Sequence, residues 1–293
     1  MEKIKGNPVV RKIGLNRIIL LGVLVLMFLA CCLGIDGFAA AGKEHLLNTL
    51  NYVYFLGFLS LGVTFVIATG GIDFSIGPVM FCCALVAGYC LNSYGFPLVI
   101  CIVLAVIIGL IFGAFNGWLV AYQSVPAFIV SMASMNIAKG IAAVFTKTQS
   151  QSWPLSTDPV NGWFRNLISY KGFPVGLVVF LLVAALCSCI LYNTKAGRYI
   201  LCLGSNREAV RLSGVDIKRW EMLAYVICGL LVGLASVYFV ACYTTVQPGY
   251  GDQYNNEAIA GCVMGGTSMV GGLASILGTV IGVSIISMLQ EGL

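Results

Sequence analysis

Asp73 interrupts the long uncharged stretches of this 293-residue sequence, and its neighbours are unsuited to a continuous helix. It lies in the segment TGGIDFSIGP at 69–78, where Gly70 and Gly71 precede it and Ser75 follows it. Glycine is conformationally free and proline lacks an amide donor, so a helix is expected to break here. A carboxylate left in hydrocarbon costs about 2.5–3.5 kcal/mol on insertion scales. We therefore expect Asp73 either to cap a helix that begins near Ser75 or to line a polar path, and the residues leave both alternatives open.

A shorter version of this pattern occurs near the end of the sequence. The segment MGGTSMVGG at 264–272 carries Gly265 and Gly266, followed by a second pair of glycines. Internal repeats are common among membrane transport proteins, so the two segments are consistent with a duplication, although the similarity is short.

The segment GSNREAVRLSG at 204–214 predicts a short, rigid helix between two apolar stretches. Asn206 can accept a hydrogen bond from the first free amides, Glu208 suits the positive N-terminal end, and Gly214 can adopt the left-handed conformation that ends a helix. We expect the helix at 207–213 to offer a firm contact surface, and an interfacial helix on anionic lipid is the alternative. The residues assigned to this contact are Gly204, Asn206, Arg207, Glu208, Ala209, Val210, Arg211, Ser213 and Gly214.

A polar and aromatic segment, YTTVQPGYGDQYNNE at 243–257, is expected to face outward. Side chains of these types can contact a sugar or a docking protein. An ordinary extracellular loop is the plainer alternative.

The remaining residues do not indicate catalysis, a cofactor or a nucleic-acid partner. His45 is the single histidine, the twelve cysteines show no metal-binding spacing, and no nucleophile has an evident base nearby. The phosphate loop G-x-x-x-x-G-K-[ST] is absent, so any ATP-driven motion needs another polypeptide. An ion-coupled secondary transporter that uses Asp73 as its carrier is a rival interpretation, although such coupling usually draws on several acids or histidines.

Long apolar stretches must position these segments. Charged residues make up 9% of the chain and apolar residues 59%, and no charged side chain occurs in the 65 residues between Asp73 and Lys139. Pieces of about 20 apolar residues span a bilayer, and irregular backbone cannot face lipid, so the sequence predicts an all-α bundle of about nine to ten transmembrane helices. We expect helices near 18–35, 48–69, 77–91, 98–120, 127–146, 173–193, 221–242, 257–270 and 272–290. A cleaved secretory signal is a weaker alternative for the first of them.

Basic residues predict the orientation of the bundle. The segment 1–17 holds five basic residues and one acid, and the loop 195–221 holds six basic residues and three acids. Positively charged loops stay in the cytoplasm, and six predicted helices separate these two segments, an even number, as a shared side requires. We therefore expect a cytoplasmic N-terminus at 1–17 and one transmembrane domain at 18–291, with the loop 147–171 outside.

Glycines recur at intervals of four residues in several predicted helices. Glycine at this spacing lets helix backbones approach closely in lipid, where no hydrophobic force drives association. We therefore expect one compact bundle. The sets are Gly109, Gly113 and Gly117; Gly229 and Gly233; Gly261 and Gly265; and Gly278 and Gly282.

Four motifs occur in an order and spacing that carry a family resemblance. They are TGGIDFSIG at 69–77, VPAFIVSMASMNIAKG at 125–140, GRYILCLGSNREAVRLSGVD at 197–216 and EAIAGCVMGGTSMVGG at 257–272. Over about 50–291 the chain resembles the ribose-type permeases of ATP-binding cassette (ABC) sugar importers. Branched-chain amino acid permeases are more distant relatives, so they stay open as an alternative for the substrate.

The resemblance implies a multi-pass protein of the bacterial inner membrane. Two permease subunits, identical or different, would form the path within membrane lipid. Two ATPase subunits, which use ATP and Mg²⁺, would dock on the helix at 207–213, and a periplasmic binding protein would deliver the sugar. Carried over by motif, the path residues would be Gly70, Gly71, Asp73, Ser75, Asn136, Gly265 and Gly266. Family members continue with one more helix beyond the segment similar to 276–293, so we expect that this sequence lacks the family's last helix.

Overall fold

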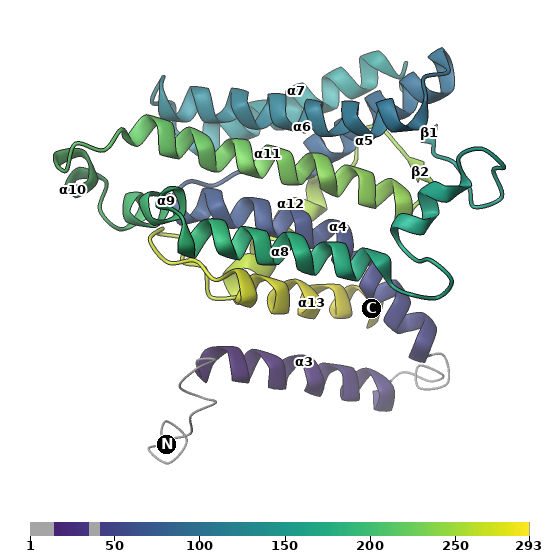
Figure 1. Cartoon of the computed structure of the whole chain (residues 1–293), viewed down its shortest axis with the longest axis horizontal. Helices are drawn as coiled ribbons and strands as arrows, with labels where there is room; N and C mark the ends of the chain where they lie inside the picture. Colours follow the sequence, from purple (N-terminus) through teal and green to yellow (C-terminus); the bar gives the residue numbers. More distant parts are fainter. Residues whose placement is uncertain (1–14, 35–41, 293) are drawn as a thin grey trace.

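The structure is a computed structural model that describes residues 15–34 and 42–292, and it is a bundle of helices (Figure 1). The expected all-α class is thus confirmed. The long helices are α3 (Leu15–Gly34), α4 (Gly42–Ala68), α5 (Ile76–Tyr94), α6 (Leu98–Ala121), α7 (Ala127–Phe145), α8 (Val175–Asn193), α11 (Ile217–Cys242) and α13 (Ile276–Gly292). The shorter elements are β1 (Gln151–Ser152), the 3-10 helix η1 (Gly162–Leu167), α9 (Lys195–Ser205), α10 (Arg207–Leu212), β2 (Thr245–Val246) and α12 (Asp252–Met264).

The long helices run along one common direction, and the connecting elements gather at the two ends (Figure 1). One end holds α9 and α10, and the opposite end holds β1 and β2, which pair antiparallel with Gln151 opposite Val246. Among the described residues, six helices are long and apolar enough to cross a membrane: α4, α5, α6, α7, α8 and α11.

Burial divides these six helices into an inner and an outer group. The most apolar 18-residue windows of α4, α5 and α11 are 83%, 78% and 72% buried inside the molecule. Those of α6, α7 and α8 are only 33%, 28% and 28% buried, although α6 and α8 are more apolar than any of the inner helices and α7 is as apolar as α5. A helix that is apolar on its exposed side needs lipid or another subunit against it. The outer helices therefore form the surface that meets the membrane.

Glycines bring the helix backbones into direct contact, as their spacing predicts. In α6 and α11, a methyl group at Gly113 would lie 2.5 Å from the Tyr225 carbonyl oxygen and 2.8 Å from the Gly229 Cα. In α12 and α13, a methyl group at Gly261 would lie 3.0 Å from the Val283 side chain, and Gly265 lies directly against Gly278. All four glycine sets thus meet pairwise, α6 with α11 and α12 with α13.

Both predicted boundaries of the helix expected at 257–270 were wrong. The helix expected at 257–270 begins at Asp252 and ends at Met264, and the segment 265–275 is not helical, because Gly266 adopts a left-handed conformation with φ of 94°. The polar segment at 243–257 is therefore partly helical, because α12 begins within it at Asp252. The loop 195–221 contains a second helix, α9, whose apolar residues Ile200 and Leu203 face the bundle.

The outer loop between α7 and α8 is anchored to the bundle by two large side chains. The Trp153 indole is 2% exposed, stacks on Phe164 and donates from Nε1 to the Ala84 carbonyl at 3.3 Å. Arg165 donates from Nε to the Pro154 carbonyl at 2.9 Å and from Nη1 to the Val240 carbonyl at 3.1 Å, near the end of α11. Burial lowers the pKa of this guanidinium. The loop therefore has a fixed shape at the end of the bundle.

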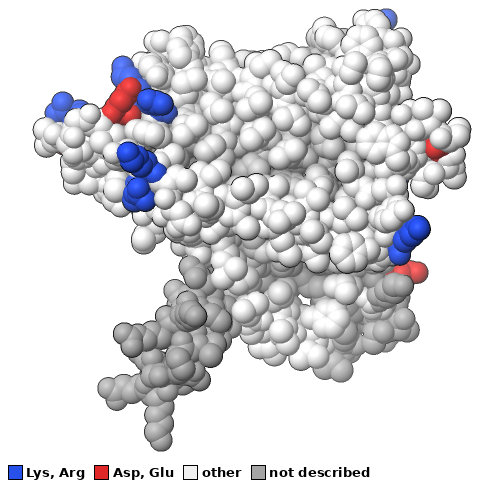
Figure 2. Space-filling view, viewed as in Figure 1, with Lys and Arg blue, Asp and Glu red and all other residues white. Residues whose placement is uncertain are grey.

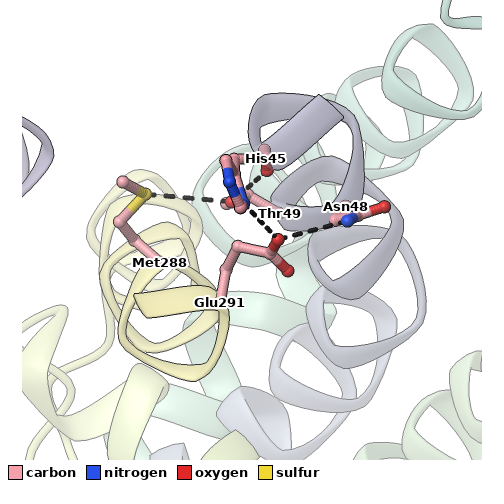
Figure 3. Close-up of polar contacts among 5 residues, drawn as sticks. All are labelled: His45, Asn48, Thr49, Met288 and Glu291. Atoms are coloured by element: carbon pink, nitrogen blue, oxygen red, sulfur yellow. Dashed lines mark hydrogen bonds and ion pairs between the residues drawn. The ribbon is translucent and has the colours of Figure 1, made fainter. Parts of the chain in front are cut away.

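The end of α13 is tied to the beginning of α4 by a polar cluster (Figure 3). Glu291 Oε1 lies 2.8 Å from His45 Nδ1 and accepts a hydrogen bond from Asn48 Nδ2 at 3.1 Å. Thr49 lies beside them and donates to the His45 carbonyl at 2.8 Å. The only histidine of the chain thus has a structural place between two helices.

Replacement of Gly113 by alanine should destabilise the bundle, because its methyl group would meet the α11 backbone, which cannot rotate away. Overpacking of this kind costs about 1–3 kcal/mol. Gly140→Ala in α7 is the matched control, since a methyl group there has nothing within 4 Å. Thermal unfolding in detergent should show a lower midpoint for Gly113→Ala and an unchanged or slightly higher one for Gly140→Ala. Equal midpoints for the two variants would show that the α6–α11 contact is not close.

Candidate functional site

Asp73 is the acceptor at the centre of a buried polar network. The residue is 3% exposed, and Oδ1 accepts hydrogen bonds from the Ser75 amide at 2.8 Å and from Ser75 Oγ at 2.6 Å. Oδ2 accepts a longer one from Asn116 Nδ2 at 3.5 Å. Asp73 therefore fixes the turn that leads from α4 into α5.

The donors around Asp73 form a chain that runs from α7 through α6 to the turn before α5. Ser134 in α7 donates to Asn116 Oδ1 in α6, and Asn116 Nδ2 donates to Ser75 Oγ at 3.0 Å. Each donor in the chain points toward the carboxylate, so the network stabilises an acceptor at position 73. The Tyr225 hydroxyl is buried nearby and has no hydrogen-bond partner among the described residues. A methyl group at Gly71 would lie 2.8 Å from it.

The cap of α5 comes from a residue to which the sequence assigned no capping role. Asn255 Oδ1 accepts a hydrogen bond from the Gly77 amide at 2.7 Å, in the first turn of α5. Asn255 lies in α12, far away in the sequence, so no local capping pattern reveals it. Asp73 supports the preceding turn, and Asn255 supplies the acceptor for the helix itself.

The residues assigned by motif to the path occupy different environments. Gly70, Asn136 and Gly266 are exposed, and Gly71 is partly exposed. Asp73, Ser75 and Gly265 are buried, and Gly265 lies against Gly278 as a contact between α12 and α13. The assignment of these residues to a path stays a prediction.

A set of exposed and partly exposed polar side chains lies on α7 and α12, and we call it the polar face. Lys139 Nζ lies 2.6 Å from Asp252 Oδ2, and the two side chains are 25% and 55% exposed. The polar face consists of Asn136, Lys139, Asp252, Gln253 and Asn256. The sequence assigned Asn136 to the path by motif and placed the three residues of α12 in the polar segment at 243–257. Lys139 and Asp252 join its two helices.

Contacts with α4 show that α12 lies at the depth of the spanning helices. Ser60 Oγ donates to the Ala258 carbonyl at 3.0 Å, and Thr64 Oγ1 lies 3.2 Å from Cys262 Sγ. Both partners on α4 are fully buried, well inside the helix Gly42–Ala68. The polar face is therefore set within the bundle and not in an outer loop. Polar groups at this depth are tolerated only where they face protein or water, so this face is not a lipid contact.

At the α9 end, three backbone segments meet without intervening side chains. The Gly272 amide donates to the Ala68 carbonyl at 3.0 Å, at the end of α4. Gly204, near the end of α9, lies directly against Ala68 and Gly272, and a methyl group at Gly271 would lie 2.8 Å from the Gly70 amide. The two double-glycine loops and α9 thus form one contact.

The short helix α10 has the caps that the sequence predicts. Asn206 Oδ1 accepts from the Ala209 amide at 3.0 Å, and Gly214 is left-handed with φ of 78°. The Ala209 side chain is exposed, and Leu212 is 73% exposed although it is apolar. Val210 faces the molecule at 8% exposure. The helix ends at Leu212, one residue short of the expected 207–213.

Both arginines of α10 are paired with acids. Arg207 forms two bonds of 2.6 Å with the two carboxylate oxygens of Glu221 in α11, and this partner raises the pKa of Arg207. Arg211 Nε donates to Glu208 within α10 at 2.9 Å, which lowers the pKa of Glu208. The Arg207–Glu221 pair also lines a cavity of about 400 Å³ together with Thr69, Gly70 and Gly71.

Charged side chains gather at the end that carries α9 and α10, whereas the visible flank of the bundle is almost free of them (Figure 2). Lys and Arg predominate there, with few acids among them (Figure 2). An uncharged band beside a basic end is typical of a membrane protein whose basic end lies in the cytoplasm.

Comparisons with known proteins place this arrangement among transport proteins. Residues 45–293 match a family described as "Branched-chain amino acid transport system / permease component". The chain is 32% identical over 277 residues to the ribose import permease protein RbsC of Escherichia coli (strain K12), which covers 94% of this chain and 84% of that protein. It is 33% identical over 252 residues to RbsC of Bacillus subtilis (strain 168), covering 85% and 76%.

A further relative carries a different sugar in its name. The xylose transport system permease protein XylH of Escherichia coli (strain K12) is 27% identical over 347 residues, covering 98% of this chain and 88% of that protein. No solved structure matches the chain. The expected resemblance to ribose-type permeases is thus confirmed.

Substitutions at Asp73 should separate its structural role from a role in a path. Asp73→Ala removes the acceptor of three donors, and a buried donor without a partner costs about 1–3 kcal/mol, so the unfolding midpoint should fall. Asp73→Asn keeps an oxygen for Ser75, so this variant should retain most of its stability and its transport. Thermal unfolding and uptake are measured on both variants. Normal stability with abolished uptake in Asp73→Asn would show that the charge itself serves transport.

Proposed function

This chain belongs to the family described as branched-chain amino acid transport system / permease component, and we propose that it is the membrane subunit of an ABC importer for a sugar. It is a transport subunit and a multi-pass membrane protein. In this proposal it forms half of the translocation path in the bacterial inner membrane. Separate ATPase subunits hydrolyse ATP with Mg²⁺, and a periplasmic binding protein delivers the sugar.

The names of its relatives support a sugar as the substrate. Two of those described above import ribose and one transports xylose by name, and they cover most of this chain. A branched-chain amino acid, which the family description names, is the second candidate. The polar face offers amides and one ion pair, which suit hydroxyl groups.

The observation that carries the proposal is the polar face at the depth of the spanning helices. Asn136 and Asn256 are exposed there. Asn136 donates from Nδ2 to the Met132 carbonyl at 2.9 Å, but lipid would offer no donor to the side-chain carbonyl oxygens of these residues. A second permease subunit that packs around this face would enclose these side chains along a water-filled path. The second subunit can be identical or different.

The α9 end supports coupling to an ATPase. Helix α10 is capped at its start, joined to α11 through Arg207 and Glu221, and exposes Leu212 at its tip. An apolar side chain exposed on a polar surface marks a contact with another protein. Movement of α10 would reach the two double-glycine loops through Gly204 and the end of α9.

The opposite end supports delivery from outside. With α9 and α10 in the cytoplasm, the N-terminus is cytoplasmic too and the loop between α7 and α8 lies in the periplasm. A cavity of about 710 Å³ lies at the base of this loop, lined in part by Asn92, Ser152 and Asp158. The fixed shape of the loop suits the docking of a binding protein.

The geometry argues against an ion-coupled transporter that uses Asp73 as its carrier. A carrier must alternate between the two sides, whereas Asp73 is 3% exposed and already accepts three hydrogen bonds. Its neighbours in the network are hydroxyls and an amide, with no second acid or histidine to relay a proton.

Uptake into proteoliposomes tests the proposed function. It also tests whether α10 is the coupling helix, which contacts the ATPase. The chain is co-expressed with the ATPase and binding protein encoded beside it, and uptake of labelled ribose and xylose is measured with enclosed ATP. We expect sugar uptake that requires ATP. Leu212→Ser should lower both ATPase co-purification and uptake by at least several-fold, because the contact loses its apolar centre.

Val160→Ser is the matched control, since Val160 is 74% exposed in the outer loop and the chemical change is the same. It should leave ATPase co-purification unchanged. Uptake that follows a proton or sodium gradient and ignores ATP would contradict the proposal. Leu212→Ser with normal uptake would contradict the coupling assignment alone.

A further inference from the structure

Four basic side chains near α9 have no acidic partner within the part of the chain that the structure describes. The ion pairs at this end are Arg207–Glu221, which joins α10 to α11, and Arg211–Glu208 within α10. The cations outside these pairs are Lys195, Arg198, Lys218 and Arg219, and all four are exposed. The charges of the coupling helix are thus balanced, whereas those beside it are not.

A tight connection places two of these cations directly at the end of α8. Thr194 is the single residue between α8 and α9, and Gly197 packs against the Leu191 carbonyl so closely that no side chain would fit. Arg198 donates from Nη1 to the Asn193 carbonyl at 3.4 Å. Lys195 and Arg198 are both exposed and lie three residues apart in α9, so they share one face of that helix.

The lipid-facing side of α8 leads to these cations. Helix α8 has 19 residues, which gives it a length of about 28 Å, close to the thickness of the hydrocarbon layer of about 30 Å. Its exposed apolar residues are Val178, Leu181, Leu182 and Leu186. The end of α8 therefore lies where hydrocarbon meets headgroups, with Lys195 and Arg198 at headgroup level.

Aromatic side chains extend the site toward α11. The Tyr199 ring lies 5.1 Å from the Trp220 ring, and the Arg219 guanidinium lies 5.4 Å from the Trp220 ring centre. Tryptophan and tyrosine prefer the headgroup region, where one edge of the ring is apolar and the other is wet. Their position supports the depth assigned to Arg198.

We infer that Lys195 and Arg198 bind the phosphate of an anionic phospholipid in the leaflet at the α9 end, with its acyl chains along the exposed apolar side of α8. The guanidinium offers a planar pair of donors to phosphate oxygens, and the ammonium adds a second charge. Arg219, beyond the Tyr199–Trp220 pair, contributes to the local positive potential. The site lies beside the coupling helix and does not depend on which substrate is transported.

The apolar stripe distinguishes a lipid from other anionic partners. Free phosphate would use the two cations but gain nothing from α8. An acidic surface of the ATPase would approach from the water side, where α10 exposes Leu212, and not from the hydrocarbon side, where α8 exposes Leu182 and Leu186.

Native mass spectrometry of the full chain in detergent tests the inference. The probes are dioleoyl phosphatidylglycerol and dioleoyl phosphatidylcholine, which differ in net charge but carry the same chains. Phosphatidylglycerol should bind more tightly. The double variant Lys195→Gln/Arg198→Gln should bind it about 25-fold more weakly, since each basic residue near the surface contributes about 1 kcal/mol, or about fivefold. Binding of phosphatidylcholine should change little.

Two matched variants serve as controls. Lys147→Gln/Lys171→Gln removes two exposed positive charges from the outer loop and should leave phosphatidylglycerol binding unchanged. Lys195→Arg/Arg198→Lys keeps both charges and should retain most of the binding, which separates loss of the site from loss of folding. Circular dichroism confirms the helical content of each variant.

Three results would overturn the inference. Equally tight binding of phosphatidylglycerol by the double variant and the unmodified chain would show that these cations are not the site. Complete displacement of the lipid by inorganic phosphate would indicate a free-phosphate site. Unchanged lipid binding with loss of ATPase co-purification would instead assign Lys195 and Arg198 to the ATPase contact.

Discussion

The cost of exposing polar groups to hydrocarbon is the constraint on which this structure depends. In the interior, buried polar groups avoid this cost because they have hydrogen-bond partners in the protein. Ser75 and Asn116 donate to Asp73, and Asn255 accepts from the first turn of α5. On the outside, α6, α7 and α8 avoid this cost because they present apolar surfaces to the lipid. The polar face between α7 and α12 fits neither solution within a single chain. In the proposed assembly, water and a second permease subunit complete this face, and its exposed polar side chains are the physical reason to propose a path there.

Direct backbone contact holds the helices of the bundle together and joins the α9 end to the interior. Glycines bring α6 onto α11 and α12 onto α13, so these pairs can move only as units. Gly204 extends the same kind of contact to α9, which meets both the end of α4 and the loop after α12. A displacement of α10 reaches these loops with no flexible side chain in between. The anionic lipid site proposed on α9 lies next to this connection.

Local properties of the sequence predicted much of the fold, and contacts between distant segments account for the rest. Apolar runs predicted the spanning helices because hydropathy is local, and Asn206 could be identified as a cap from its immediate neighbours. The cap supplied by Asn255 could not be foreseen, because its partner Gly77 lies in another helix. The pairing of Lys139 with Asp252 depends on the depth of α12, which contacts with α4 decide. Contacts between distant segments also decide the environment of Asp73. Its residue type allowed two roles, and the structure shows that it is buried.

Reaction of cysteines in intact membranes tests most directly whether the polar face lines a water-filled path. In a background without native cysteines, Asn136→Cys on the polar face is compared with Leu182→Cys, which is 60% exposed on the lipid side of α8. Thiols react with charged methanethiosulfonate reagents only as thiolates, and these form in water but not in hydrocarbon. We predict rapid modification of Asn136→Cys, protection by excess transported sugar, and no modification of Leu182→Cys. Equal and slow modification of both cysteines would contradict the account, because the polar face would then be no wetter than the surface that meets lipid.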